Sequence, residues 1–77
     1  MYPEGTLINP SNNSLIVFEK DINNPDNEGF VCFWTITDQN SKQLVFKKRI
    51  NKKKAFNKYN NLLREGWKSY KNNDLAA

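Results

Sequence analysis

The chain has 77 residues, of which 38% are hydrophobic and 13% aromatic, and its net charge is +4. This length predicts one small domain, residues 1–77, whose core is barely large enough for stability. Five Phe, three Tyr and two Trp compensate for the modest apolar fraction, because each aromatic side chain buries a large area. The single Cys excludes an intramolecular disulfide. Because the chain also has no His, few of the usual metal ligands are present.

Catalytic chemistry has little support in the sequence. There is no His to act as a base, no pair of carboxylates at a catalytic spacing and no glycine-rich phosphate loop. We therefore expect a protein that is not an enzyme, with no catalytic or metal-binding residues and no cofactor.

The cellular compartment can be inferred in part from the lone Cys32 and from the apolar run around it, residues 30–34. This run is far too short to span a membrane, and the first fifteen residues lack the basic and apolar segments of a signal peptide. We expect a cytoplasmic protein without a membrane partner. Cys32 fits that reducing compartment, and its apolar surroundings indicate a small core residue and not a reactive thiol.

Charge is divided unevenly along the chain. Residues 1–41 carry a net charge of −5 and residues 42–77 a net charge of +9, with six cations among residues 47–54. A surface this basic attracts phosphates or acidic proteins. An alternative source is the base composition of the genome, because Asn and Lys have A/T-rich codons and together make up 23 residues. The lysine run is then only a solvated face.

Turn residues divide the first fifty positions into four predicted strands. Residues 6–8 and 14–18 form a hairpin around the Pro- and Asn-rich turn at 9–13. A long polar loop, residues 21–29, follows. Residues 30–37 are the strongest strand, and because they are apolar on both faces we expect an internal strand covered at least partly on each side.

The fourth strand and a helix complete the prediction. Residues 43–50 pair with the third strand as a hairpin, with Leu44, Phe46 and Ile50 pointing inward. Asn51 caps a helix whose apolar residues repeat at helical spacing: Ala55, Phe56, Tyr59, Leu62 and Leu63. Gly66 can end this helix in a left-handed conformation, with Trp67 packing back on Leu62; alternatively the spacing continues to Tyr70.

The sequence thus predicts an α+β fold, a four-stranded mainly antiparallel sheet followed by one C-terminal helix packed on a face (ββββα). Residues 72–77 read as a frayed tail.

The predicted binding residues are basic side chains on the fourth strand, the helix and the segment that follows it. They are Lys47, Lys48, Arg49, Lys52, Lys53, Lys54, Lys58, Arg64 and Lys68. Three lysines in the first helical turn oppose the helix dipole at about 0.3–1 kcal/mol each where exposed, which a bound anion would offset. Lys47 and Arg49 are expected to extend this patch from the strand.

The leading hypothesis is a module that binds nucleic-acid phosphates with little sequence preference, since only two arginines are present. Trp34 or Phe33 would stack bases if exposed on the sheet, whereas the alternative places both in the core. A second hypothesis is a protein-interaction regulator, an adaptor or small inhibitor, that docks its basic helix or an exposed strand edge on an acidic partner protein. Self-association of acidic loops with the helix of another copy is also open.

The chain resembles a family of small uncharacterised proteins from marine cyanobacteria and their phages, a domain of unknown function. The resemblance lies in residues 4–10 and 18–21, in residues 44–49, and in Ala55, Tyr59, Leu62, Gly66 and Trp67. Thr6 stands where that family has Trp, and Asn9 where it has Asp. Ala55 and Tyr59 also resemble the helix of WGR domains, which bind nucleic acid, although the Trp-Gly-Arg signature is absent. Neither resemblance transfers a catalytic residue.

Overall fold

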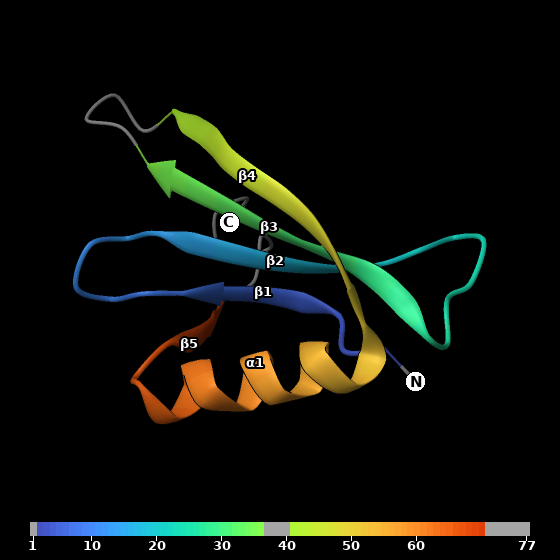
Figure 1. The fold of residues 1–77 in the computed structure, drawn as a ribbon. Coiled ribbons are helices and arrows are strands. Elements are labelled where there is room, and N and C mark those ends of the chain that lie inside the picture. The colour runs from blue at the N-terminus through green and yellow to red at the C-terminus, as the bar shows by residue number, and fades with distance from the viewer. Residues whose placement is uncertain (1, 37–40, 71–77) are drawn as a thin grey trace.

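The computed structural model describes residues 2–36 and 41–70, which form one antiparallel sheet and one helix (Figure 1). The predicted α+β class and the antiparallel sheet are confirmed. The strands lie in the order β4-β3-β2-β1-β5, and each pairs antiparallel with its neighbour. The elements are β1 (Gly5–Ile8), β2 (Leu15–Lys20), β3 (Glu28–Ile36), β4 (Lys42–Asn51), α1 (Lys52–Arg64) and β5 (Lys68–Tyr70). The tail predicted at 72–77 lies outside the described residues.

The prediction of four strands followed by a terminal helix is wrong, because α1 lies between β4 and a fifth strand. Gly66 ends the helix with a φ of +103°, and the N–H of Trp67 donates to the Leu62 carbonyl at 3.0 Å. This is a Schellman motif, so the predicted helix end at Gly66 is confirmed and the continuation to Tyr70 is not. The chain then turns back, and β5 pairs with β1 along the edge opposite to β4.

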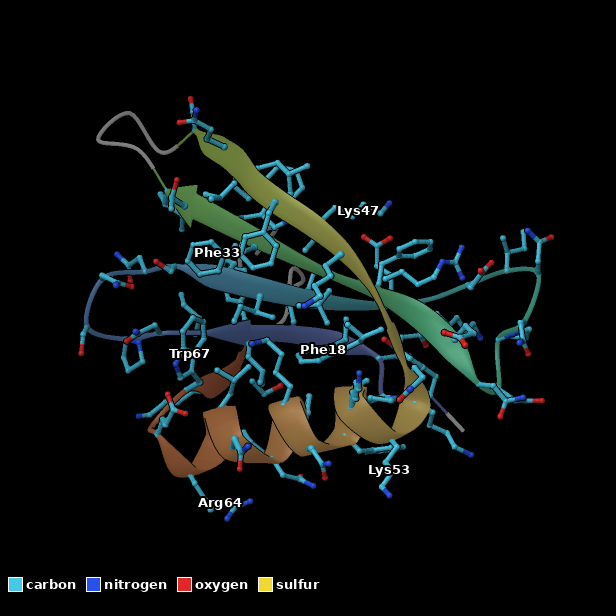
Figure 2. The ribbon with its side chains drawn as sticks, viewed as in Figure 1. Phe18, Phe33, Lys47, Lys53, Arg64 and Trp67 are labelled. Atoms are coloured by element: carbon cyan, nitrogen blue, oxygen red, sulfur yellow. The ribbon has the colours of Figure 1, made fainter. Side chains whose placement is uncertain are left out.

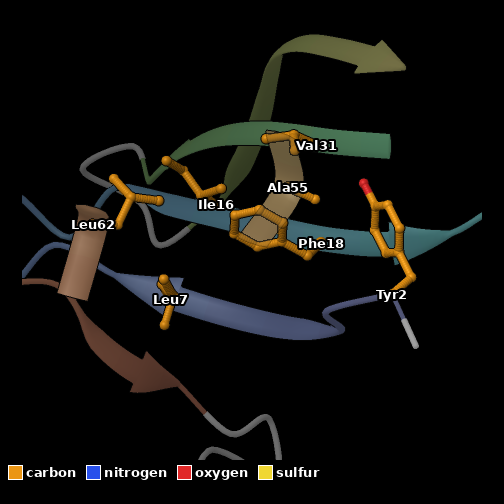
Figure 3. Packing of buried hydrophobic residues seen from close by; sticks show 7 residues of the cluster. All are labelled: Tyr2, Leu7, Ile16, Phe18, Val31, Ala55 and Leu62. Carbon is orange, nitrogen blue, oxygen red and sulfur yellow. The ribbon is translucent and has the colours of Figure 1, made fainter. Parts of the chain in front are cut away.

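The core lies between α1 and one face of the sheet (Figure 3). Its sheet side comes from β1, β2 and β3, and Tyr2 packs beside it. The buried cluster consists of Tyr2, Leu7, Ile16, Phe18, Val31, Ala55 and Leu62. Ala55 has no exposed surface, so the helix backbone approaches the sheet closely at that point. The ring of Tyr59 meets that of Phe18 edge-on at 5.3 Å, which extends the contact along the helix.

Strand β3 is apolar on both faces, as predicted. Val31 pairs with Phe18 on the face that carries α1, whereas Cys32 pairs with Val17 on the opposite face. Cys32 is 2% exposed, and burial together with the Glu19 carboxylate raises the pKa of its thiol. The prediction of a small buried residue at Cys32 is confirmed.

A β-bulge in β4 overturns the predicted facing of its apolar residues. Phe33 pairs with Phe46 but Trp34 pairs with Leu44, so Val45 has no partner in β3. The extra residue puts Leu44 and Phe46 on opposite faces, instead of both inward. They are 43% and 46% exposed. Strict alternation cannot reveal a bulge, which explains the wrong prediction.

Gly29 is required at the start of β3, where this strand meets Tyr2. A Cβ at this position would overlap the backbone carbonyl of Glu19 and the Tyr2 ring. The Tyr2 hydroxyl donates to the carbonyl of Ile50 at 3.3 Å, which ties the N-terminal segment to the end of β4. The start of β3 and the end of β4 are thereby held together next to the start of α1.

We expect Leu7→Ala to lower the free energy of unfolding by about 2–5 kcal/mol, because Leu7 has no exposed surface and its truncation leaves a cavity. Leu63→Ala is the matched control, since Leu63 is 42% exposed, and should cost about 1 kcal/mol or less. Urea unfolding followed by far-UV circular dichroism measures both. Equal losses would contradict the assignment of the core.

Candidate nucleic-acid interface

The start of α1 follows β4 without a connecting loop, so the cationic run passes directly from strand to helix. The Asn51 side chain caps the helix, because its oxygen accepts the N–H of Lys54 at 2.9 Å. This confirms the predicted cap. The N–H of Lys52 donates to the Asn27 carbonyl at 2.8 Å. Two of the N–H groups at the helix start are therefore already used within the chain, and an anion bound here would depend on lysine side chains.

Alternation along β4 divides the cations between the two faces of the sheet. Lys48 pairs with Val31, whose side chain lies in the core beneath α1, whereas Lys47 pairs with Cys32 on the opposite face. Arg49 shares the face of Lys47. Lys47 therefore lies apart from the helix lysines, whereas Arg49 lines one hollow together with Lys48 and Lys54.

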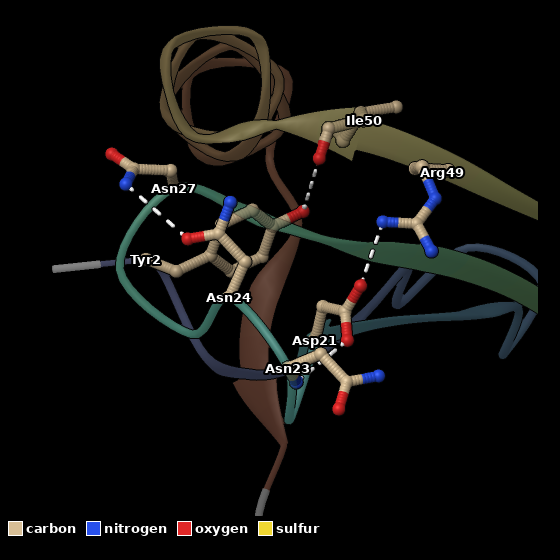
Figure 4. A network of polar contacts seen from close by, with 7 residues as sticks. All are labelled: Tyr2, Asp21, Asn23, Asn24, Asn27, Arg49 and Ile50. Atoms are coloured by element: carbon tan, nitrogen blue, oxygen red, sulfur yellow. Dashed lines mark hydrogen bonds and ion pairs between the residues drawn. The ribbon is translucent and has the colours of Figure 1, made fainter.

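Lys47 and Arg49 make contacts within the chain. The Lys47 Nζ and the Arg49 guanidinium lie 4.7 Å and 4.8 Å from the centre of the Phe30 ring. Arg49 Nη1 also donates to Asp21 Oδ2 at 2.7 Å (Figure 4). Asp21 is the better buried partner, with 9% of its side chain exposed against 56% for Arg49. Arg49 thus helps to hold the loop after β2 against β4, whereas Lys47 packs on Phe30 of β3.

The other carboxylate oxygen of Asp21 accepts the N–H of Asn23 at 2.9 Å. This bond first, and the Arg49 guanidinium second, lower the pKa of Asp21 below its ordinary value of 3.8. The sequence placed Asp21 only in a polar loop. Its role depends on a strand 28 residues away, which no local pattern indicates.

The second group of cations surrounds the corner where β4 becomes α1. We call it the corner lysines: Lys48, Lys52, Lys53, Lys54 and Lys58. Within residues 2–36 and 41–70, none of them has an ion-pair partner. A hollow of 260 Å³ opens at this corner, lined by Glu28, Lys48, Arg49, Ile50, Asn51 and Lys54. Helix α1 has no acidic residue, so Glu28 is the one carboxylate lining the hollow.

Arg64 and Lys68 lie away from this corner. Figure 2 shows Lys53 and Arg64 pointing away from the sheet at opposite ends of α1. Lys68 belongs to β5, at the sheet edge opposite to β4. Of the nine predicted binding residues, five thus lie on β4 or α1 around this corner, whereas Lys47, Arg64 and Lys68 lie elsewhere. Arg49 lines the hollow but is paired with Asp21.

The predicted stacking residues fall on different faces. Phe33 packs against the core and stacks on Phe46, with 5.6 Å between ring centres. Trp34 is half-buried on the opposite face, where it pairs with the buried Leu15. Trp34 therefore lies on the other face from the helix lysines and cannot stack the bases of a nucleic acid that these lysines bind.

In the described ranges, no helix has the length and apolar character needed to cross a membrane. The same ranges contain no group of three or more Cys, Asp and Glu arranged to hold a metal ion. Comparison of the chain with protein-family models, with curated proteins and with solved structures finds no match. The two family resemblances therefore stay predictions.

We expect the Asp21 carboxylate to make stability depend on acid pH. Since native Asp21 binds its proton less tightly than unfolded Asp21, its contribution is complete above pH 3.8 and is lost as the pH falls through the lower native pKa. Asp21→Asn should be less stable than the parent at neutral pH, and the gap should close in acid. Urea midpoints between about pH 7 and pH 2 measure this gap.

Asp26→Asn changes an exposed carboxylate in the same loop and serves as the control. A gap between parent and Asp21→Asn that is constant across this range would contradict the role given to the Asp21–Arg49 pair.

Proposed function

We propose that this protein is a non-enzymatic module that binds nucleic-acid phosphates through the corner lysines. One observation carries the proposal: α1 begins with three consecutive lysines, has no acidic residue, and stands beside a hollow whose charged side chains are mainly cationic. Cations at a helix start interact unfavourably with the helix dipole and lower the stability of the helix. A bound polyanion would offset this unfavourable free energy.

The mode of binding follows from the residue types. Lysines act as point charges and contact phosphate oxygens without reading bases, so affinity should be sequence-tolerant and should depend steeply on salt. Lys47 and Arg49 are excluded from the proposed phosphate contacts because both make cation–π contacts with Phe30. Arg49 also forms an ion pair with Asp21. The buried free thiol of Cys32 fits a module that works in the reducing cytoplasm.

We expect labelled single- and double-stranded oligonucleotides to bind in fluorescence anisotropy, with little preference for sequence. If about four lysines contact phosphates, affinity for duplex DNA should fall roughly 100-fold between about 50 and 200 mM salt. Changing Lys53 and Lys54 together to Gln should weaken binding at the lower salt and reduce the slope of log affinity against log salt by about two.

Changing Lys20 and Lys68 to Gln gives a control with the same change in net charge on residues outside the corner. Gln and Lys have similar helix propensity, so the corner variant should keep its fold. Equal weakening by the two double variants would mean that only net charge matters, and absence of binding at about 50 mM salt would refute the proposal.

A further inference from the structure

The outer edge of β4 is unusual for so small a sheet. β4 has 10 residues, pairs with β3 on one side, and has no partner on its other side among the described residues. Figure 1 shows the first part of β4 along one margin of the sheet. A strand at an edge presents unpaired N–H and C=O groups, which form a template for another strand.

Three consecutive apolar residues are exposed on this edge strand. Leu44, Val45 and Phe46 are 43%, 54% and 46% exposed. The bulge at Val45 sets Leu44 and Phe46 on opposite faces of the sheet at nearly the same point along the strand. An added strand would therefore find apolar surface on both of its faces here, instead of on one.

The charge of β4 decides what kind of strand fits. Its sequence from Lys42 to Asn51 contains four cations and no acid. Antiparallel pairing with a second copy about Val45 would place Lys42 opposite Lys48, and like charges directly opposite each other are destabilising. The same lysines would face opposite charge on an acidic strand.

We infer that the outer edge of β4 accepts an extended acidic segment of another protein as an additional antiparallel strand. Main-chain hydrogen bonds supply the pairing, apolar side chains of the segment cover Leu44, Val45 and Phe46, and its carboxylates meet Lys48. The lysines and the bulge, which protect an edge from uncharged strands and from copies of itself, then act as the selective feature. This surface differs from the outward face of α1, and the inference does not rest on the proposed function.

The test uses the whole chain and a fluorescein-labelled peptide with blocked ends, matched to β4 at 10 residues. The peptide carries alternating Glu and Thr in its N-terminal half, the order that matches β4 in antiparallel pairing. Its C-terminal half carries successive Val residues, so that apolar side chains reach both Leu44 and Phe46 on their opposite faces. One control peptide has Lys in place of Glu. Another has the same side chains, with an N-methyl group on every backbone amide so that neither edge of the peptide can pair as a strand.

We expect the acidic peptide to bind in fluorescence anisotropy, and both control peptides to bind at least about tenfold more weakly. Equal binding of the acidic peptide and its N-methylated form would overturn the inference, because charge alone would then explain the contact. Absence of binding by the acidic peptide would overturn it as well.

Variants locate the site and separate it from the corner lysines. Val45→Glu should weaken peptide binding at least about tenfold, whereas Ile22→Glu, an equivalent change at a loop residue that is 88% exposed, should leave it unchanged. Changing Lys53 and Lys54 to Gln should weaken oligonucleotide binding while the peptide still binds. Equal effects of Val45→Glu and Ile22→Glu on peptide binding would place the site elsewhere.

Sedimentation analysis addresses a second copy as the occupant. We expect the parent chain to be a monomer at micromolar concentration. A dimer that Val45→Glu dissociates would assign the edge to self-pairing and overturn the inference.

Discussion

The structure depends on the contact of one helix with one face of a five-stranded sheet. Ala55 and Leu62 lie against Leu7, Ile16 and Phe18, and the small Ala55 side chain allows the helix backbone to come close. This contact fixes the path of the chain from β4 at one edge to β5 at the other. It also turns Lys53 and Arg64 away from the sheet, so the charged surface of α1 follows from the position of its apolar stripe.

The alternation of side chains along β4 explains why its cations are divided between two faces of the sheet and not gathered in one place. Residues that alternate on β4 must point to opposite faces, so Lys47 and Arg49 are separated from Lys48 by strand geometry alone. The acidic first half of the chain then neutralises part of the basic second half through Asp21 and Arg49. The cations that remain without an ion-pair partner, among the described residues, include those at the start of α1.

Sequence patterns predicted the elements that depend on local chemistry. Residues close together in the sequence determine four of the features that were predicted. These are the Asn51 cap, the helix end at Gly66, the first hairpin and the two apolar faces of β3. The fifth strand was missed because Lys68–Tyr70 is short and becomes a strand only through pairing with β1. The bulge at Val45 was missed because a single extra residue leaves no mark on an alternating pattern. Contacts between distant segments, such as Asp21 with Arg49, have no local signal at all.

The pairing of β5 with β1 has a consequence for the order in which the protein assembles during synthesis. β1 is the first strand in chain order, and its partner on one side is the last described element, with Thr6 opposite Tyr70. The β1–β2–β3–β4 meander can pair as it leaves the ribosome, but β1 keeps an unpaired edge until α1 and β5 have followed. Until β5 has paired, the sheet has open edges at both β1 and β4, which is a state prone to aggregation.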